Sequence, residues 1–318
     1  FICGFSVCML NTVVNPMLNS IGGGGNKGNQ LNLIGGTLNS LAGTLTPMLV
    51  GGLIGQVTRS TQMSDINLVL FIAMAVFASA FIILIFIPIS NPTQKKADVV
   101  YERSPWAFRH CVLGIIGIFL YVGIEIGIPA TLNFYLSDTT DKGAGLLENA
   151  ATIGGFVAGT YWFLMLVGRF LAGFIADKVS SKMMMTCVSA AGIVLILFAM
   201  FIPKTVTTSM PIFTGTSFSM VVVPLSALLL VLCGLCTSVM WSSIFNISVE
   251  GLGKYTEAAS GLFMMMVVGG GIMPLLQNQI ADSTGYMISY IVPVLSLAYL
   301  LFYAVIGSKN VNKDIPVE

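Results

Sequence analysis

One carboxylate interrupts a long apolar run in the middle of the chain. Between Arg109 and Asp138 the only formally charged residue is Glu125. At about 1.5 Å per residue, a helix would place Glu125 about 24 Å from Arg109 and about 20 Å from Asp138. A charge at that depth is costly unless it faces a bundle interior or a water-filled cavity. Glu125 is therefore a candidate functional residue, with a structural hydrogen bond to a neighbouring helix as the alternative.

The composition indicates a membrane protein. The 318 residues are 56% hydrophobic and only 8% charged, whereas soluble domains are about 25% charged. The net charge of +1 gives no reason to expect a nucleic-acid partner. Cys233-x-x-Cys236 lies in an apolar run without a neighbouring histidine, so we expect buried thiols and no metal site. The sequence contains no nucleotide-binding loop or nucleophile–base cluster, and we expect neither enzyme activity nor a resident cofactor.

Nine apolar segments are long enough to cross a bilayer, at about 20 residues per span. They lie near residues 1–20, 30–56, 66–89, 107–136, 150–177, 183–203, 220–248, 256–281 and 285–307. We therefore predict an all-α polytopic membrane protein with nine transmembrane helices. Phe1 lies inside an apolar run, and three further helices before it would give twelve. We expect a chain that lacks its first three helices.

Basic residues predict the orientation, because cytoplasmic loops carry more Lys and Arg. One set of alternate loops contains Lys27, Lys95, Lys96, Arg103, Arg109, Lys178, Lys182, Lys254, Lys309 and Lys313, and the opposite set contains Arg59, Lys142 and Lys204. This bias places the C-terminus in the cytoplasm. A central loop at 91–106 would then separate residues 1–90, the end of one six-helix half, from 107–308, a second six-helix half, with a tail at 309–318.

Two similar patterns favour related halves. Gly-x-x-x-Pro-x-Leu begins at Gly43 in the second segment and at Gly270 in the eighth. Parallel repeats of this kind are typical of transporters built from two halves. Chance is the alternative, because Gly and Pro are common in membrane helices.

Amide side chains are unusually frequent in the spans. They are Asn11, Asn15, Asn32, Asn39, Asn133, Asn246, Gln277 and Asn278. An unpaired buried amide costs about 1–3 kcal/mol, so each needs a partner. Together they suit a cavity for a neutral, hydroxyl-rich ligand such as a sugar, on which the ring of Trp241 can stack. For any single amide, a hydrogen bond between helices is the alternative.

A charged motif follows the fifth segment. Gly173, Asp177, Lys178 and Lys182 match the pattern G-x-x-x-D-[RK]-x-G-[RK]-[RK], with Ser180 and Ser181 as departures, and Arg169 precedes it in the helix. Asp177 can accept from a helix N-terminus, and the lysines can face helix C-termini and anionic lipid. The pattern resembles the loop signature of the major facilitator superfamily. The resemblance implies a twelve-helix fold, of which this chain supplies helices 4–12, and a role for these residues in conformational gating.

Further stretches resemble the fucose/galactose/glucose symporter family within that superfamily. They are Asn11-Thr-Val-Val-Asn15-Pro16, Leu38-Asn39-Ser40, Tyr121-Val-Gly-Ile-Glu125, Met240-Trp-Ser-Ser-Ile-Phe245-Asn and Gly269-Gly-Gly-Ile-Met-Pro274. The resemblance implies a bacterial inner-membrane sugar:cation symporter that works by alternating access. It places Asn39 at a sugar-cavity asparagine, Trp241 at an aromatic position and Glu125 at a position held by Glu or Gln.

One departure bears on the coupling ion. Members that use protons carry a glutamate where this chain has Asn11, and an amide takes up no proton near neutral pH. Coupling would then use Glu125, a carboxylate on the missing helices, or Na⁺ in place of H⁺. Glu125 is the candidate within this chain, because burial disfavours its charged form.

These observations predict import of a neutral hexose, of the glucose, galactose or fucose type, by cation-coupled alternating access. The candidate substrate-binding residues are Asn11, Asn15, Asn39, Glu125, Asn133, Trp241, Gln277 and Asn278. We expect a multi-pass monomer in the bacterial inner membrane, with sugar, cation and bilayer as its partners. Efflux of another small solute and a membrane sugar sensor that does not transport are the alternatives.

Overall fold

The computed structural model describes residues 2–54, 62–88, 102–146, 150–214, 217–312 and 315, of which 43–54, 63 and 65 are described by backbone alone. Most of the predicted central loop 91–106 lies outside the described residues, as do Arg59, Lys95, Lys96 and Lys313 of the orientation argument. The side chains of the first repeat, from Gly43 onward, also lie outside them.

The chain forms two compact units. The first contains Phe1–Ser40 and Tyr101–Glu318, and the second contains Leu41–Val100. Helix α1 (Ile2–Ile21) and the start of α2 (Gly25–Ile54) belong to the first unit, whereas α3 (Met63–Phe86) belongs to the second. The predicted division into two six-helix halves stays a prediction.

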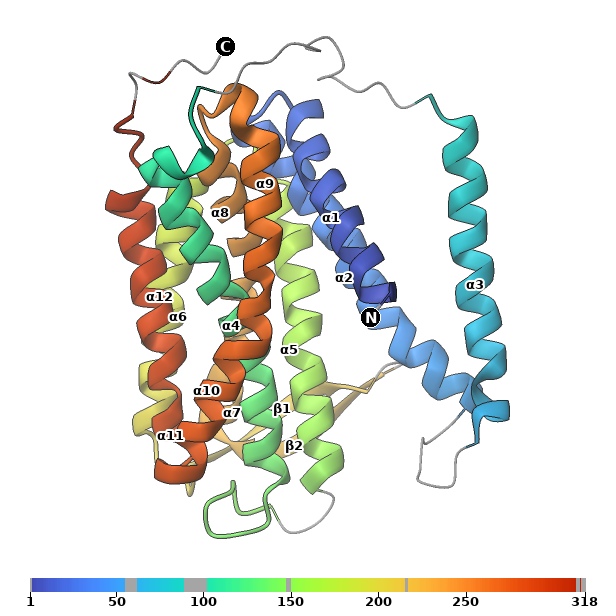
Figure 1. Ribbon diagram of the computed structural model, residues 1–318. Coiled ribbons are helices and arrows are strands. Elements are labelled where there is room, and N and C mark those ends of the chain that lie inside the picture. The colour runs from blue at the N-terminus through green and yellow to red at the C-terminus, as the bar shows by residue number, and fades with distance from the viewer. Residues whose placement is uncertain are drawn as a thin grey trace. The chain divides into compact units, whose positions relative to one another are not determined.

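The first unit is otherwise built from helices and one hairpin (Figure 1). In order they are η1 (Pro105–Ala107), α4 (Arg109–Ser137), α5 (Ala150–Gly173), α6 (Ser181–Phe201), β1 (Thr207–Phe213), β2 (Phe218–Pro224), α7 (Leu225–Thr237), α8 (Met240–Val249), η2 (Gly253–Tyr255), α9 (Thr256–Met265), η3 (Met266–Val268), α10 (Gly269–Thr284), α11 (Tyr286–Ser289), α12 (Ile291–Phe302) and η4 (Tyr303–Gly307).

The predicted all-α membrane architecture is confirmed. Within the described residues, eight helical segments are long and apolar enough to cross a membrane. Helix α2, the second predicted span, is helical over 30 residues, but its side chains are described only as far as residue 42, so its place in the membrane stays a prediction.

Helix α4 is the centre of the first unit, because α5, α8, α10 and α12 all pack against it. Glycines allow the closest of these contacts. A Cβ atom at Gly269 would clash with the backbone carbonyl of Phe119, and one at Gly123 would clash with Cβ of Met273. The α4–α10 interface therefore depends on glycine at these two positions, and small residues are common where membrane helices pack closely.

The connection from α6 to α7 differs from the prediction. Residues 220–224 were expected to begin a span, but they belong to β2, which pairs antiparallel with β1 from Thr207↔Pro224 to Phe213↔Phe218. The residues that pair are rich in β-branched and aromatic side chains, which favour strands. Near the turn, Phe163 of α5 stacks on Phe213 with ring centroids 4.6 Å apart.

Two spans are interrupted near their middle. The seventh consists of α7 and α8, which are separated at Ser238 and Val239, and the eighth consists of α9 and α10, which are joined by the 3-10 turn η3. An interrupted helix frees backbone carbonyls for other partners. The first interruption supplies acceptors to the charged site described next.

Candidate functional site

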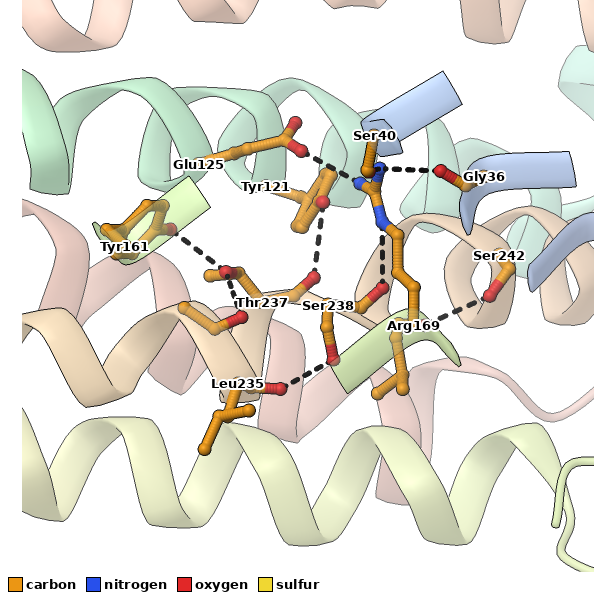
Figure 2. Close-up of polar contacts among 12 residues, drawn as sticks. Gly36, Ser40, Tyr121, Glu125, Tyr161, Arg169, Leu235, Thr237, Ser238 and Ser242 are labelled. Carbon is orange, nitrogen blue, oxygen red and sulfur yellow. Dashed lines mark hydrogen bonds and ion pairs between the residues drawn. The ribbon is translucent and has the colours of Figure 1, made fainter. Parts of the chain in front are cut away.

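Glu125 forms an ion pair inside the first unit. Its Oε1 accepts a hydrogen bond from Nη2 of Arg169 at 3.0 Å, and the two side chains are only 13% and 9% exposed. Glu125 comes from α4 and Arg169 from α5 (Figure 2). Each charge lies in an apolar helix and would be costly alone, so the pair compensates both.

Arg169 reaches two further elements. Its Nε donates to the carbonyl of Ser238 at 3.2 Å, in the interruption between α7 and α8. Its Nη1 donates to Oγ of Ser40 at 2.6 Å and to the carbonyl of Gly36 at 3.4 Å, both on α2. The planar guanidinium has five N–H donors in a fixed arrangement. The side chain of Arg169, on α5, can therefore bond at once to α4, to α2 and to the interruption between α7 and α8.

A glycine allows the interruption to come this close. A Cβ atom at Gly168 of α5 would lie 2.5 Å from Oγ and 2.7 Å from Cβ of Ser238. The Oγ of Ser238 donates to the carbonyl of Leu235 at 2.6 Å and stays within its own helix. The carbonyl of Ser238 therefore lies close to α5, where it accepts the hydrogen bond from Arg169.

Aromatic side chains border the ion pair. Tyr121 lies one turn before Glu125, and its hydroxyl donates to the carbonyl of Thr237 at 3.2 Å. The hydroxyls of Tyr161 and Thr237 are 2.9 Å apart (Figure 2). The ring centroid of Trp241, which is half-buried, lies 6.3 Å from that of Tyr121. The predicted residue Trp241 therefore lies beside Tyr121, which is one helical turn from Glu125.

Asn39 lies next to the site in the chain. It is exposed on α2 and directly precedes Ser40, which binds Arg169. Of the amides predicted to bind substrate, Asn39 is the one whose chain neighbour contacts the ion pair.

The amides on α4 and α10 lie elsewhere. Oδ1 of Asn133 accepts from the hydroxyl of Ser137 at 3.1 Å, two turns beyond Glu125. Asn278 donates to the carbonyl of Pro274 at 2.8 Å and accepts from the hydroxyl of Thr131 at 3.3 Å. Both amides therefore have partners within or between these helices.

Gln277 is almost completely buried beside α4. Its Oε1 lies 2.6 Å from the position that a Cβ atom of Gly127 would occupy. Its Nε2 has no hydrogen-bond partner among the described residues, which leaves a donor for another molecule.

Asn11 and Asn15 lie on α1 and bond to each other. The side-chain amide of Asn15 donates to the carbonyl of Asn11 at 2.9 Å, and Asn11 is exposed. Neither residue is among the hydrogen-bond partners of Arg169 in the described part of the chain. Their role in substrate binding stays a prediction.

The charged motif occupies the turn between α5 and α6. Gly173 ends α5, Asp177 and Lys178 are exposed, and Ser180 caps α6 by accepting from the amide of Met183. Nζ of Lys182 lies 3.6 Å from the carboxylate of Glu250. Arg169 was grouped with this motif from the sequence, and the structure places it at Glu125, about one turn before the end of α5 at Gly173.

Amide side chains join α1 and α2 to the helices near the turn between α5 and α6. The sequence did not identify them as a group. Asn19 donates to Oδ1 of Asn246 at 2.9 Å, and Asn246 donates to Oγ of Ser181 at 2.9 Å. Gln30 of α2 donates to the carbonyl of Gly173 at 2.9 Å. We call these three hydrogen bonds the amide contacts. Their members were visible as polar residues in apolar helices, but nothing in the sequence paired them.

Comparisons with known proteins agree with this architecture. The glucose/galactose transporter of Brucella abortus is 28% identical over 316 residues, which are 98% of this chain and 71% of that protein. The crystal structure of the fucose:proton symporter of Escherichia coli has a TM-score of 0.75 at 15% identity, and covers 95% of this chain and 74% of that one. A second structure of that symporter, in the outward conformation, has a TM-score of 0.70 at 16% identity, over 95% of this chain and 73% of that one.

These relatives are membrane transporters rather than enzymes. The family model described as Major Facilitator Superfamily matches residues 1–273, well over half of the sequence. The resemblance drawn from the loop motif and the amide stretches is therefore confirmed: this chain belongs to the Major Facilitator Superfamily.

Proposed function

We propose that this protein is a secondary active transporter that imports a neutral hexose by cation-coupled alternating access. The observation that carries the proposal is the ion pair of Glu125 and Arg169, which lies among α4, α5, α2 and the interruption at Ser238. Transporters commonly bind substrate and ion beside interrupted helices within the membrane. A balanced ion pair leaves no fixed net charge, which suits a neutral ligand.

The likeness to the glucose/galactose transporter supports the choice of a hexose. The ring of Trp241 offers a surface for a pyranose, and the neighbouring amide of Asn39 and the free donor of Gln277 offer hydrogen bonds. The sugar, a coupling cation and the bilayer are the proposed partners of a monomer in the bacterial inner membrane, with its C-terminus in the cytoplasm.

The coupling ion is proposed to act through Glu125. The likeness to a fucose:proton symporter favours H⁺, and Na⁺ is the second possibility. Within the described spans, Glu125 is the carboxylate paired to a buried cation, whereas Asn11 carries no proton.

Counterflow tests this proposal. Full-length protein in liposomes is loaded with unlabelled glucose or galactose, and uptake of the labelled sugar is followed without an ion gradient. We expect uptake that exceeds that of protein-free liposomes at least tenfold and that L-glucose does not support. Absence of exchange by correctly folded protein would contradict hexose transport; binding without exchange would favour a sensor. Imposed H⁺ and Na⁺ gradients then identify the ion that drives accumulation.

A further inference from the structure

Arg169 connects α2 to the other helices of the first unit. Of its four hydrogen bonds, two go to Glu125 and the carbonyl of Ser238, and two go to Gly36 and Ser40 of α2. The backbone of α2 lies close at this point, since a Cβ atom at Gly36 would be 3.6 Å from Cδ of Arg169. The shortest of the four bonds, at 2.6 Å, is the one to Ser40.

The charge of Arg169 is balanced from one side only. Among the described residues, its ion-pair partner is Glu125, and its acceptors at Ser238, Gly36 and Ser40 are neutral. The other ionisable groups that face the pair are the hydroxyls of Tyr121 on α4 and Tyr161 on α5, which are neutral near pH 7. If Glu125 loses its negative charge, the site keeps an unbalanced buried cation, which is an unfavourable state.

We propose that the charge of Glu125 controls whether α2 stays on Arg169. With Glu125 ionised, the pair is neutral and the guanidinium remains buried beneath α2. When a cation neutralises Glu125, Arg169 gains from solvation by water, and α2 moves away from Arg169, which breaks the bonds to Gly36 and Ser40 and admits the water. Arg169 is thus a positioning residue that links ion binding to the movement of α2. The proposal deepens the proposed coupling, and its readout needs no sugar.

Spin-label distances on the full-length protein test this link. Labels are placed at Leu38→Cys on α2, beside Ser40, and at Val194→Cys on α6, two exposed positions, after the exposed Cys3, Cys8 and Cys187 are changed to Ser. Glu125→Gln imitates the neutral side chain and should raise the ratio of long to short distances about tenfold. Glu125→Gln combined with Arg169→Gln removes both charges and should return the ratio to near that of the parent protein.

Two further variants complete the test. Ser40→Ala removes an acceptor of Arg169 and leaves the ion pair intact, so it should raise the ratio by a smaller factor, about threefold. Glu250→Gln neutralises the exposed carboxylate beside Lys182. Neither residue of this pair bonds to α2 among the described residues, so the variant should leave the distances unchanged. The proposal is overturned if Glu125→Gln leaves the distances unchanged, or if the double variant is as open as the single one. If hexose exchange fails but the distances respond to the charge of Glu125, the result contradicts hexose transport and leaves the link between Glu125 and α2 standing.

Discussion

Two regions hold α1 and α2 against the helices that follow, and they use different chemistry. At Arg169 a buried ion pair shares its cation with two acceptors on α2. The amide contacts, at the end that carries Lys178, join Asn19 to Asn246 and Gln30 to Gly173 without charge. One proton can unbalance the first region, whereas amides do not titrate near neutral pH. The ion pair is therefore suited to releasing α2 when its charge changes, whereas the amide contacts are suited to keeping α1 and α2 in place.

The largest effect is expected from Arg169→Ala. It leaves Glu125 as an unpaired charge in an interior where its side chain is 13% exposed, which should cost about 3–5 kcal/mol. We expect a lower apparent melting temperature in detergent and loss of hexose counterflow. Arg103→Ala, which removes an exposed cation, is the matched control. A variant as stable as the parent would show that Glu125 finds another partner. The ion pair would then not differ from the amide contacts in its sensitivity to charge.

Asn246→Asp converts an amide contact into a group that titrates. The charged carboxylate would lie where Asn246 is 8% exposed and would lose its donor to Ser181, at a cost of about 3 kcal/mol at neutral pH. Protonation restores both the donor and the neutral state, so the penalty should fade as the pH is lowered.

Distances between labels at Lys27→Cys and Met183→Cys measure this effect. The Asp variant should be open at pH 8 and closed at pH 5, and Asn246→Gln should show no such trend. An Asp variant that is equally closed at both values would mean that water already reaches Asn246.

Parts of this comparison are predictable from the sequence. Glu125 and Arg169 are lone charges in separate apolar helices, and such residues pair with one another. The sequence singled out Glu125 correctly as a buried carboxylate, but it placed Arg169 with the loop motif, because Gly173 and Asp177 follow it so closely. Treating every intramembrane charge as half of a pair would have joined the two.

Other parts are not predictable from local sequence. The interruption at Ser238 contains no proline, and its nearest glycine is Gly234, so no local signal marks it. Its cause is tertiary, because Gly168 lets α5 approach and the carbonyls of Thr237 and Ser238 gain partners there. The hydrogen-bond partners of the amide side chains also depend on which helices pack together, and the local sequence does not determine this.

Gln30→Ala should weaken the amide contacts modestly. It removes one donor to the carbonyl of Gly173 at 2.9 Å, in a partly buried place where water can replace it, so we expect about 1 kcal/mol. The ratio of long to short label distances should rise about fivefold and should be independent of pH. Asn26→Ala, whose bond to Asp177 is 3.4 Å long and exposed, is the control and should have a smaller effect. A pH-dependent response would show that this region also contains a titrating group.

The smallest effect is expected at the exposed ion pair of Lys182 and Glu250. Their side chains are 41% and 63% exposed and the N–O distance is 3.6 Å, so water and salt screen the attraction. Such pairs contribute about 0–1 kcal/mol, and both partners lie outside α1 and α2. Glu250→Gln should therefore leave the label distances and hexose exchange within error of the parent at 0.15 M salt. If it opens the protein as strongly as Glu125→Gln, the motif lysine gates through this pair, and charge then controls both ends of α2 instead of one.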